Sequence, residues 1–377
     1  MSADSALLSV ENLRTEFYTD KETVRAVDGV NFDIKRGETL GIVGESGSGK
    51  SVTARSIMGL VESPGTVLSG SSIQLDGEEL TEKSEKQYQQ VRGARIAMVF
   101  QDPLTSLNPV YTVGNQLKET LKLHRDLSGQ ALTDTAIDLL EDVGIPDAAR
   151  RLHEYPHQFS GGMRQRTVIA LALACNPELL ICDEPTTALD VTIQAQILEL
   201  LEEIQEERDL AIMFITHDMG VIAEVADRVG VMYAGEIVEN APVLDLYADP
   251  AHPYTQGLLA SIPGNSPDAE ELQTIEGEVP IPNGPAKRCR FEPRCPEAFE
   301  ECLEVHPELL PVEDQGDDHT AACLLYPDDM SRTDAVEAHR AAGTEENESE
   351  TEDSDGETED SDGETEDSDD ETEDDNE

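Results

Sequence analysis

Eight residues near the N-terminus have the types and the order needed to hold a phosphate chain. The segment Gly44–Ser51 reads GESGSGKS and matches GxxxxGK[ST] at every required position, after an apolar run and before a helical one. Glycines let backbone N–H groups close around phosphates, Lys50 adds a positive charge, and the Ser51 hydroxyl suits Mg²⁺. A chance Gly-rich turn explains this context poorly. We predict a Mg²⁺–nucleotide site at Gly44, Glu45, Ser46, Gly47, Ser48, Gly49, Lys50 and Ser51.

Two carboxylates follow a second apolar run. The segment LLICDEP at 179–185 places Asp183 and Glu184 where a buried strand should end. Open α/β sheets bind ligands outside the carboxyl ends of their strands. We expect Asp183 to hold Mg²⁺ and Glu184 to polarise an attacking water. An apolar run followed by Asp-Glu is common by itself, but downstream of a phosphate loop it predicts nucleotide hydrolysis.

The elements that must position these groups alternate along the chain. Apolar runs predict strands at Thr39–Val43, Leu179–Cys182 and Leu210–Thr216, and helices are predicted at Thr192–Arg208 and Met219–Asp227. Such alternation implies a mostly parallel sheet covered on both faces. Residues 7–43 read as short strands with a hairpin turn at Asp28-Gly29, and residues 103–158 read as helical.

The charge composition limits the possible partners. The chain has 26 basic and 81 acidic residues, a net charge of −55. The last 34 residues contain 21 acids and no bases, which leaves −34 on the remainder. An acidic cytosolic protein is the plainest interpretation, but this excess favours adaptation to a high-salt cytoplasm, where repulsion is screened. The surface disfavours nucleic acid, which needs basic patches, and also direct contact with anionic lipid.

Both ends of the chain carry further signals. Residues 1–10 lack the features of a signal peptide, and no apolar run approaches the ~20 residues of a membrane-spanning helix. We therefore expect a soluble, cytoplasmic protein in which structural disulfides are disfavoured. From residue 331 the chain loses branched apolar residues and then repeats ETEDSDG, a composition that predicts disorder.

Four more motifs follow in a fixed order: Gln101 in MVFQDP, Ser160-Gly161-Gly162 in FSGGMRQR, Asp190 in TALD and His217 in ITHD. Taken singly, each of these residues has a purely structural interpretation: a polar turn residue, a helix cap, or a histidine at a strand end whose hydrogen bonds are satisfied within the fold. With the first two motifs, they resemble the ATP-binding-cassette (ABC) ATPases. The resemblance implies a P-loop NTPase ABC cassette with a RecA-like, mostly parallel α/β core, an antiparallel β subdomain and a helical subdomain.

The resemblance also assigns roles. Gln101 matches the Q-loop glutamine that senses Mg²⁺ and water, and His217 matches the switch histidine near the γ-phosphate. Ser160-Gly161-Gly162 matches the signature turn that contacts the nucleotide of a second cassette, and Asp190 matches the D-loop. Alignment selects Phe17 as the aromatic residue that stacks on adenine, and Tyr18 is the second candidate. The alternative is that Phe17 is only an aromatic residue of the core.

Three further segments narrow the family. Met163 in FSGGMRQR, ALDVTIQAQIL at 188–198 and HPYTQGLL at 252–259 resemble the ATPases of oligopeptide/dipeptide importers, over about residues 7–326. This implies a peripheral subunit at the cytoplasmic face of the membrane, paired with a second ATPase in a heterodimer or a homodimer. Two permeases and an extracellular solute-binding protein complete the expected assembly. Relatives carry peptides, nickel or sugars. A soluble ABC ATPase acting on nucleic acid or ribosomes is the alternative from another class.

Six cysteines divide into two groups. Cys175 and Cys182 lie in apolar contexts typical of small core residues. Four others occupy a Pro-rich segment, separated by five, six and twenty intervening residues and without a CxxC pair: Cys289, Cys295, Cys302 and Cys323. The matching segment of some peptide importers holds a four-iron cluster. A [4Fe-4S] cluster, Zn²⁺ or reduced thiols are therefore all consistent with this set.

These signals divide the chain into five parts. Residues 1–102 carry the β subdomain and the phosphate loop, and 103–165 the helical subdomain with the signature turn. The second part of the core is expected at 166–240, a C-terminal domain with four cysteines at 241–330, and a disordered acidic tail at 331–377.

Overall fold

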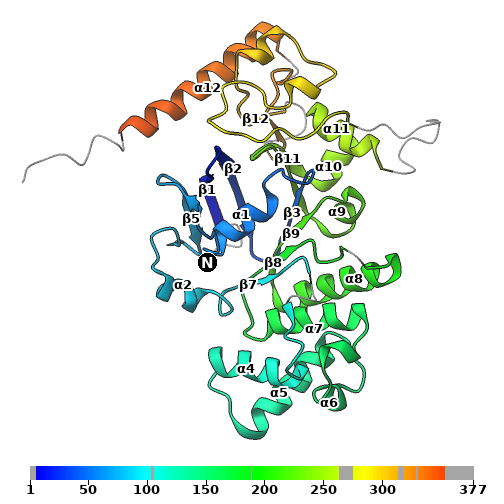
Figure 1. Ribbon diagram of the computed structural model, residues 1–377. Helices are drawn as coiled ribbons and strands as arrows, with labels where there is room; N and C mark the ends of the chain where they lie inside the picture. The colour runs from blue at the N-terminus through cyan, green and yellow to red at the C-terminus, as the bar shows by residue number, and fades with distance from the viewer. Residues whose placement is uncertain are drawn as a thin grey trace, which may run out of the picture.

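Two β-sheets and the helices around them make up the chain, in a computed structural model that describes residues 6–102, 106–187, 189–262, 275–312, 318–327 and 330–352 (Figure 1). The larger sheet has the strand order β12-β13-β11-β10-β3-β9-β8-β7. Its parallel part consists of β10 (Arg228–Tyr233), β3 (Thr39–Val43), β9 (Ala211–Thr216), β8 (Leu179–Asp183) and β7 (Ile96–Val99). This confirms the mostly parallel core predicted from the alternating sequence.

The antiparallel edge of this sheet comes from the part of the chain after residue 235. It consists of β11 (Glu236–Pro242), β13 (Thr320–Ala321) and β12 (Leu310–Pro311). The C-terminal region therefore extends the core sheet by hydrogen bonding instead of standing apart from it.

The smaller sheet is antiparallel and has the order β2-β1-β5-β6, with β4 also paired to β1. Its strands are β1 (Ala6–Tyr18), β2 (Thr23–Lys35), β4 (Gly65–Val67), β5 (Ser72–Leu75) and β6 (Glu78–Glu79). The predicted hairpin turn at Asp28-Gly29 is wrong, because the chain reverses between Tyr18 and Thr23. Gly29 is instead a bulge inside β2: Leu13 pairs with Val30, Arg14 pairs with Asp28, and Gly29 has φ +77°.

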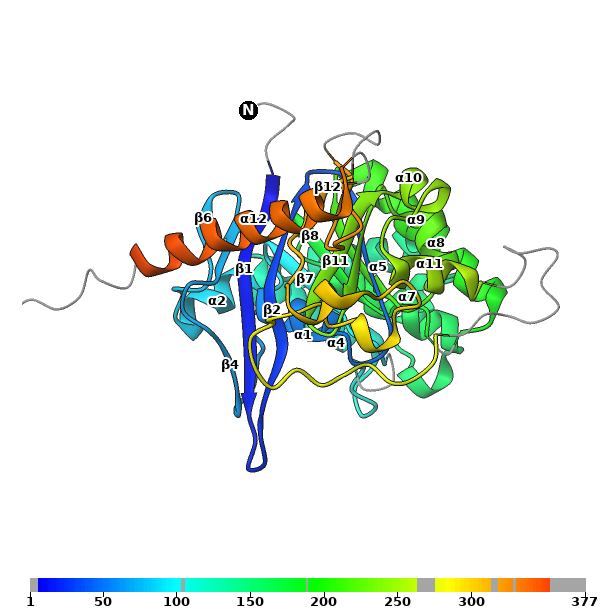
Figure 2. The ribbon, with the colours of Figure 1, turned by 90° about the horizontal axis from the view of Figure 1, so that it is seen from above.

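The helices form a separate lobe and a covering layer. The lobe, at the opposite end of the molecule from the C-terminal region (Figure 1), contains α4 (Val113–His124), α5 (Gly129–Asp142), α6 (Ala148–Arg151) and α7 (Gly161–Leu173). The other helices are α1 (Lys50–Ile57), α2 (Glu85–Val91), α8 (Val191–Arg208), α9 (Met219–Val225), α10 (Val243–Ala248) and α11 (Pro253–Ala260). Figure 2 shows β1 and β2 on one side of the parallel sheet and α7 to α9 on the other.

Alternating side chains of the parallel strands bury two cores. In β9, Met213 and Ile215 pack in the cluster shared with the antiparallel sheet, whereas Ile212 and Phe214 pack in the cluster shared with the helices. Because side chains of a strand point alternately to opposite faces, one continuous apolar run serves both layers. The sheet that carries the predicted motifs is therefore fixed on both faces.

The prediction of disorder from residue 331 is wrong for its first part. Arg332–Glu352 form helix α12, which is anchored by buried Ala335 and Val336. His339, one turn further on, has its Nε2 within hydrogen-bond distance of the backbone oxygens of Cys323 (3.1 Å) and Tyr326 (3.0 Å). A few buried positions at helical spacing are enough to dock an otherwise acidic segment. Residues 353–377 lie outside the described part.

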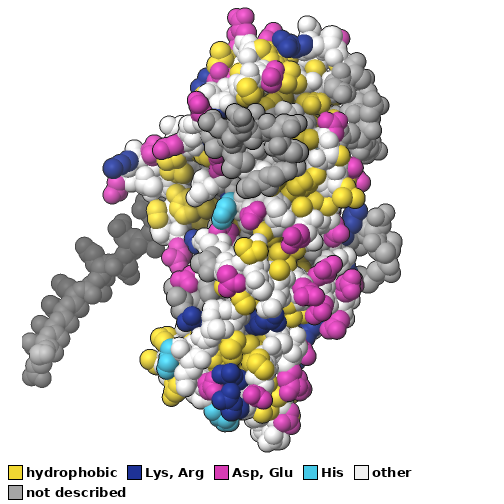
Figure 3. Space-filling model, turned by 90° about the vertical axis from the view of Figure 1, so that its right-hand side faces the viewer, with side chains coloured by type: hydrophobic (Ala, Val, Ile, Leu, Met, Phe, Trp, Pro, Cys, Tyr) yellow, Lys and Arg dark blue, Asp and Glu magenta, His cyan; other side chains and the backbone are white. Residues whose placement is uncertain are grey.

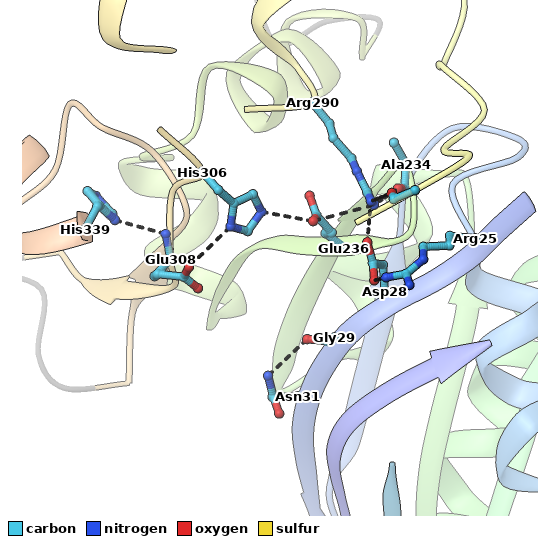
Figure 4. Close-up of polar contacts among 11 residues, drawn as sticks. Arg25, Asp28, Gly29, Asn31, Ala234, Glu236, Arg290, His306, Glu308 and His339 are labelled. Atoms are coloured by element: carbon cyan, nitrogen blue, oxygen red, sulfur yellow. Dashed lines mark hydrogen bonds and ion pairs between the residues drawn. The ribbon is translucent and has the colours of Figure 1, made fainter. Parts of the chain in front are cut away.

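A chain of polar contacts ties the C-terminal region to the antiparallel sheet (Figure 4). The Arg290 guanidinium pairs with Asp28 and donates to the Ala234 carbonyl at 2.7 Å, and Asp28 also pairs with Arg25 at 2.8 Å. Beside it, His306 lies between Glu236 (Nε2–Oε1 3.0 Å) and Glu308 (Nδ1–Oε1 3.3 Å). Burial alone would lower the pKa of His306, but the two carboxylates outweigh it and raise this pKa to about 10.

Replacing His306 with glutamine is expected to destabilise the fold in a pH-dependent way. Because the folded-state pKa is raised, the stabilisation is complete below the ordinary histidine pKa of ~6.5 and is lost as the pH rises through about 10. We expect the free energy of unfolding to fall by about 2 kcal/mol at pH 6.5, and the gap to narrow toward pH 10. Urea denaturation at several pH values measures this gap, with exposed His153→Gln as the control. A gap that stays constant with pH contradicts the charged bridge.

Acidic side chains outnumber basic ones on one face of the molecule (Figure 3). Figure 3 shows Asp and Glu scattered across one whole face, with Lys and Arg confined to a few places. Of the helices in the described ranges, none is both long enough and apolar enough to cross a bilayer.

Candidate functional site

The phosphate loop joins the carboxyl end of β3 to the start of α1. Its backbone requires glycine at two places, since a Cβ on Gly44 would lie 2.1 Å from the Met232 carbonyl oxygen and one on Gly49 would lie 2.3 Å from that of Ala26. Gly47 and Gly49 have φ values of +84° and +110°. The loop therefore packs closely between β10 and β2. Residues other than glycine at these positions would clash with its neighbours or strain its backbone.

Lys50 is buried beneath this loop, with 5% of its surface exposed. Its ammonium donates hydrogen bonds to the carbonyl oxygens of Gly44 (2.6 Å) and Glu45 (2.9 Å). Burial lowers the pKa of Lys50, while the nearby carboxylates of Glu184, Asp183 and Glu45 act in the opposite direction. The side chain therefore places one cation among three carboxylates at the loop.

Two oxygen donors suited to Mg²⁺ meet at the end of β8. The Ser51 hydroxyl donates to Asp183 Oδ1 at 2.8 Å, although the two residues are 132 positions apart. Burial raises the pKa of Asp183, and the Ser51 hydrogen bond works against this rise. A hydroxyl and a carboxylate on rigid elements are hard oxygen ligands, so the pair fits Mg²⁺ by the chemistry of its donors.

Glu184 is the centre of a second group of polar contacts. Its backbone is left-handed, with φ +49°, an uncommon conformation for a residue other than glycine. The carboxylate accepts hydrogen bonds from Gln101 Nε2 (2.9 Å) and Thr187 Oγ1 (2.9 Å), and it lies 3.3 Å from His217 Nδ1. Burial would raise the pKa of Glu184, but the contacts with Thr187 and His217 outweigh it and lower this pKa. Glu184 is therefore a carboxylate at neutral pH, which a general base must be.

The structure thus brings five predicted residues together from distant parts of the sequence. Gln101 follows β7, Asp183 ends β8 and Glu184 follows it, His217 follows β9, and Ser51 lies in the first turn of α1. These strands are parallel, so their carboxyl ends meet at one edge of the sheet. Thr187 was missed by the sequence reasoning; a hydroxyl three residues after Glu184 was the only local signal for it.

The signature turn is placed differently. Ser160 caps the start of α7 by accepting the Met163 N–H at 3.3 Å, and Asp190 caps α8 by accepting that of Ile193 at 3.0 Å. Gly162 lets α8 approach, because a Cβ there would lie 2.8 Å from Ile193. No hydrogen bond among the described residues joins Ser160–Gly162 to the phosphate loop.

The predicted adenine-stacking aromatic lies on β1. Phe17 is half-buried, and a Cβ on Gly65 of β4 would lie 2.6 Å from its ring. Its neighbour Tyr18 is 52% exposed. Phe17 therefore presents part of its ring to solvent beside β4, and its stacking role stays a prediction.

Four cysteines line one small cavity of about 20 Å³: Cys289, Cys295, Cys302 and Cys323. Burial raises the pKa of all four thiols, to about 12 for Cys289 and Cys323. All are free, and within the described ranges no three His, Cys, Asp or Glu side chains have the arrangement of a metal site. The donors suit a metal chemically, but their spacing does not fit one here. Cys182 is fully buried, as expected of a core residue.

Comparisons with known proteins agree with this geometry. A family model described as "ABC transporter" matches residues 27–187, and one described as "Oligopeptide/dipeptide transporter, C-terminal region" matches residues 238–302. The oligopeptide transport ATP-binding protein AppD of Bacillus subtilis is 50% identical over 325 residues, which cover 86% of this chain and 98% of AppD. The dipeptide transport ATP-binding protein DppD of the same organism is 50% identical over 85% of this chain and 94% of its own length.

Solved structures show the same cassette. The dimeric bacterial ABC transporter cassette MJ0796 matches with a TM-score of 0.56 and 28% identity, over 63% of this chain and 98% of that one. The CbiO1 protein of Clostridium perfringens, part of the transporter complex CbiONQ, matches with a TM-score of 0.57 and 28% identity, over 65% and 92% of the two chains.

Proposed function

Since this chain belongs to the ATP-binding proteins of oligopeptide and dipeptide ABC transporters, we propose that it hydrolyses ATP to drive peptide import. The observation that carries the proposal is the 50% identity to AppD along nearly the whole of that protein, including the C-terminal region. The meeting of the phosphate loop, Asp183 and Glu184 at one sheet edge supports it.

Each residue of the site has a part in this reaction. The N–H groups of residues 44–49 bind the phosphates, and Lys50 neutralises them. Ser51, Gln101 and Asp183 would hold Mg²⁺, which when bound neutralises phosphate charge. Glu184 accepts the proton of the attacking water, while Gln101 and His217 orient that carboxylate.

The complete site belongs to a pair of cassettes. Ser160, Gly161, Gly162 and Asp190 face the nucleotide held by a second ATPase subunit, in a heterodimer or a homodimer. The exposed cap at Ser160, without a hydrogen bond to this chain's own phosphate loop among the described residues, supports a role toward a partner. The dimeric form of the structural relative MJ0796 supports it as well.

The subunit is peripheral, at the cytoplasmic face of the membrane, beneath two permeases served by an extracellular solute-binding protein. Affinity purification from a gently solubilised membrane tests this assembly. We expect two multi-spanning proteins and a second ATPase to co-purify. Ribosomes or DNA in their place would favour the soluble class of ABC proteins. If ATP hydrolysis by the complex responds to nickel or sugars but not to peptides, the proposed substrate is wrong and the proposed mechanism still holds.

The acidic surface fits a high-salt cytoplasm, where screening removes self-repulsion. The purification should therefore be done in molar KCl. We expect the melting temperature of the protein to fall as KCl is removed, and an equal melting temperature in dilute buffer would contradict this adaptation.

The cysteine cavity is proposed as a [4Fe-4S] site, with Zn²⁺ or reduced thiols as the alternatives. Its four sulfur donors support the proposal, although binding requires the thiols to lose their protons and move together. Protein purified without oxygen should contain about four iron and four acid-labile sulfide per chain. Replacing Cys302 with serine should remove both, and replacing Cys175, a half-buried cysteine away from the cavity, should remove neither. Zinc without sulfide would instead indicate a Zn²⁺ site, and the absence of any metal would indicate reduced thiols.

A further inference from the structure

The second residue of the phosphate loop is bound to the C-terminal region. Arg294 donates two hydrogen bonds to the Glu45 carboxylate, from Nη1 to Oε2 at 2.7 Å and from Nη2 to Oε1 at 3.0 Å. The two residues are 249 positions apart. The Arg294 side chain is only 6% exposed and that of Glu45 is 29% exposed. A paired, two-pronged contact of this kind is among the strongest and most directional that side chains make.

Arg294 is held in place from several sides. Its Nε donates to the backbone oxygen of Glu276 at 2.9 Å, and Nη2 is also within hydrogen-bond distance of the backbone oxygens of Ile275 (3.3 Å) and Gly277 (3.3 Å). Its guanidinium carbon also lies 5.7 Å from the ring centre of Tyr233. The cation is therefore fixed before it meets Glu45, so little side-chain freedom is lost in forming the pair.

The backbone of Glu45 has a partner in the same region. Its N–H donates to the buried hydroxyl of Tyr254 at 2.9 Å. The Tyr254 ring packs against Tyr233 and Phe291, with ring centres 4.7 and 5.4 Å apart. Both the side chain and the backbone of Glu45 are thus set by residues outside the phosphate loop.

The charge of Glu45 would matter to a nucleotide. Glu45, Asp183 and Glu184 all influence the Lys50 ammonium, so the Glu45 carboxylate lies within electrostatic range of the loop's phosphate site. ATP adds several negative charges there. An unpaired carboxylate in the loop would repel them, and partial burial weakens the screening by salt.

We propose that Arg294 is a positioning residue of the ATP site, which neutralises Glu45 and holds the phosphate loop ready for ATP. The C-terminal region is then part of the nucleotide site and not only an attachment to it. This inference rests on the proposed function, because it presupposes that residues 44–51 bind ATP.

A double-mutant cycle on the full complex tests the pair. Arg294→Gln is expected to raise KM for MgATP about five- to tenfold with kcat changed less than twofold, since the unpaired Glu45 opposes binding. In an E45Q background the same R294Q change should alter KM less than twofold, because there is no carboxylate left to neutralise. Arg294→Lys, which keeps the charge, should fall between wild type and R294Q. The control is Arg288→Gln, a half-exposed arginine in the same segment, which should behave as wild type.

Equal KM increases from R294Q in the wild-type and E45Q backgrounds would show a purely structural role and overturn the proposal, as would an unchanged KM in the wild-type background. Circular dichroism monitors folding of each variant. Should R294Q not fold, R294K carries the test, with a KM increase of at least twofold expected only when Glu45 is present. A wild-type complex without ATPase activity would instead overturn the proposed function.

Discussion

Replacing Glu184 with glutamine is expected to lower kcat for ATP hydrolysis by about 10² to 10⁴, the usual contribution of a general base. The amide has nearly the same shape but cannot accept the proton of the attacking water. Glu184 is well suited to that task, because its contacts with Thr187 and His217 keep it ionised despite partial burial. ATP binding should survive, since the phosphate loop and Lys50 are untouched. Rapid-quench measurement of phosphate release gives kcat.

The same variant should trap the ATP-bound pair of subunits. With hydrolysis blocked, ATP-dependent association measured by size-exclusion chromatography is expected to persist. Glu199→Gln is the matched control, as an exposed glutamate on α8 with no part in the site. An E184Q protein that hydrolyses ATP at the rate of E199Q would remove Glu184 from its proposed role.

Replacing Lys50 with alanine is expected to raise KM for ATP about a hundredfold or more, because it removes the buried ammonium beneath the phosphate loop. The fold should persist. Burial lowers the pKa of Lys50, so the charged ammonium costs free energy in the folded state, and alanine relieves this cost.

A thermal shift assay distinguishes the loss of ATP binding from a loss of folding. ATP should raise the melting temperature of the wild type by mass action, but not that of K50A. Exposed Lys86→Ala on α2 serves as the control and should respond to ATP like the wild type. An ATP-induced shift in K50A equal to that of K86A would contradict the placement of the nucleotide at this loop.

The sequence was sufficient to predict which of the motif residues meet at one edge of the sheet. The motif residues follow apolar strands, and parallel strands bring the residues after their carboxyl ends to one edge regardless of sequence distance. Ser51 and Asp183 therefore meet across 132 residues, as their motifs require. The same reasoning failed at Asp28-Gly29, where a turn-like pair is a β-bulge held by Arg25 and Arg290.

Contacts that depend on tertiary packing could not be predicted from the sequence. Nothing in the segment around Arg294 indicates that its guanidinium meets Glu45, because no periodicity or motif connects positions 249 residues apart. Helix α12 was hidden for a related reason: three buried positions, Ala335, Val336 and His339, dock a segment whose composition is otherwise that of a disordered chain.

Peptide-dependent ATP hydrolysis by the reconstituted transporter tests the central claim most directly. The complex, with its solute-binding protein, is placed in lipid vesicles in molar KCl, and phosphate release is measured with and without peptide. We predict that peptide accelerates hydrolysis and accumulates inside the vesicles, and that both effects are lost with E184Q. Hydrolysis that is indifferent to peptide but stimulated by DNA or ribosomes would contradict the assignment of this chain to peptide import.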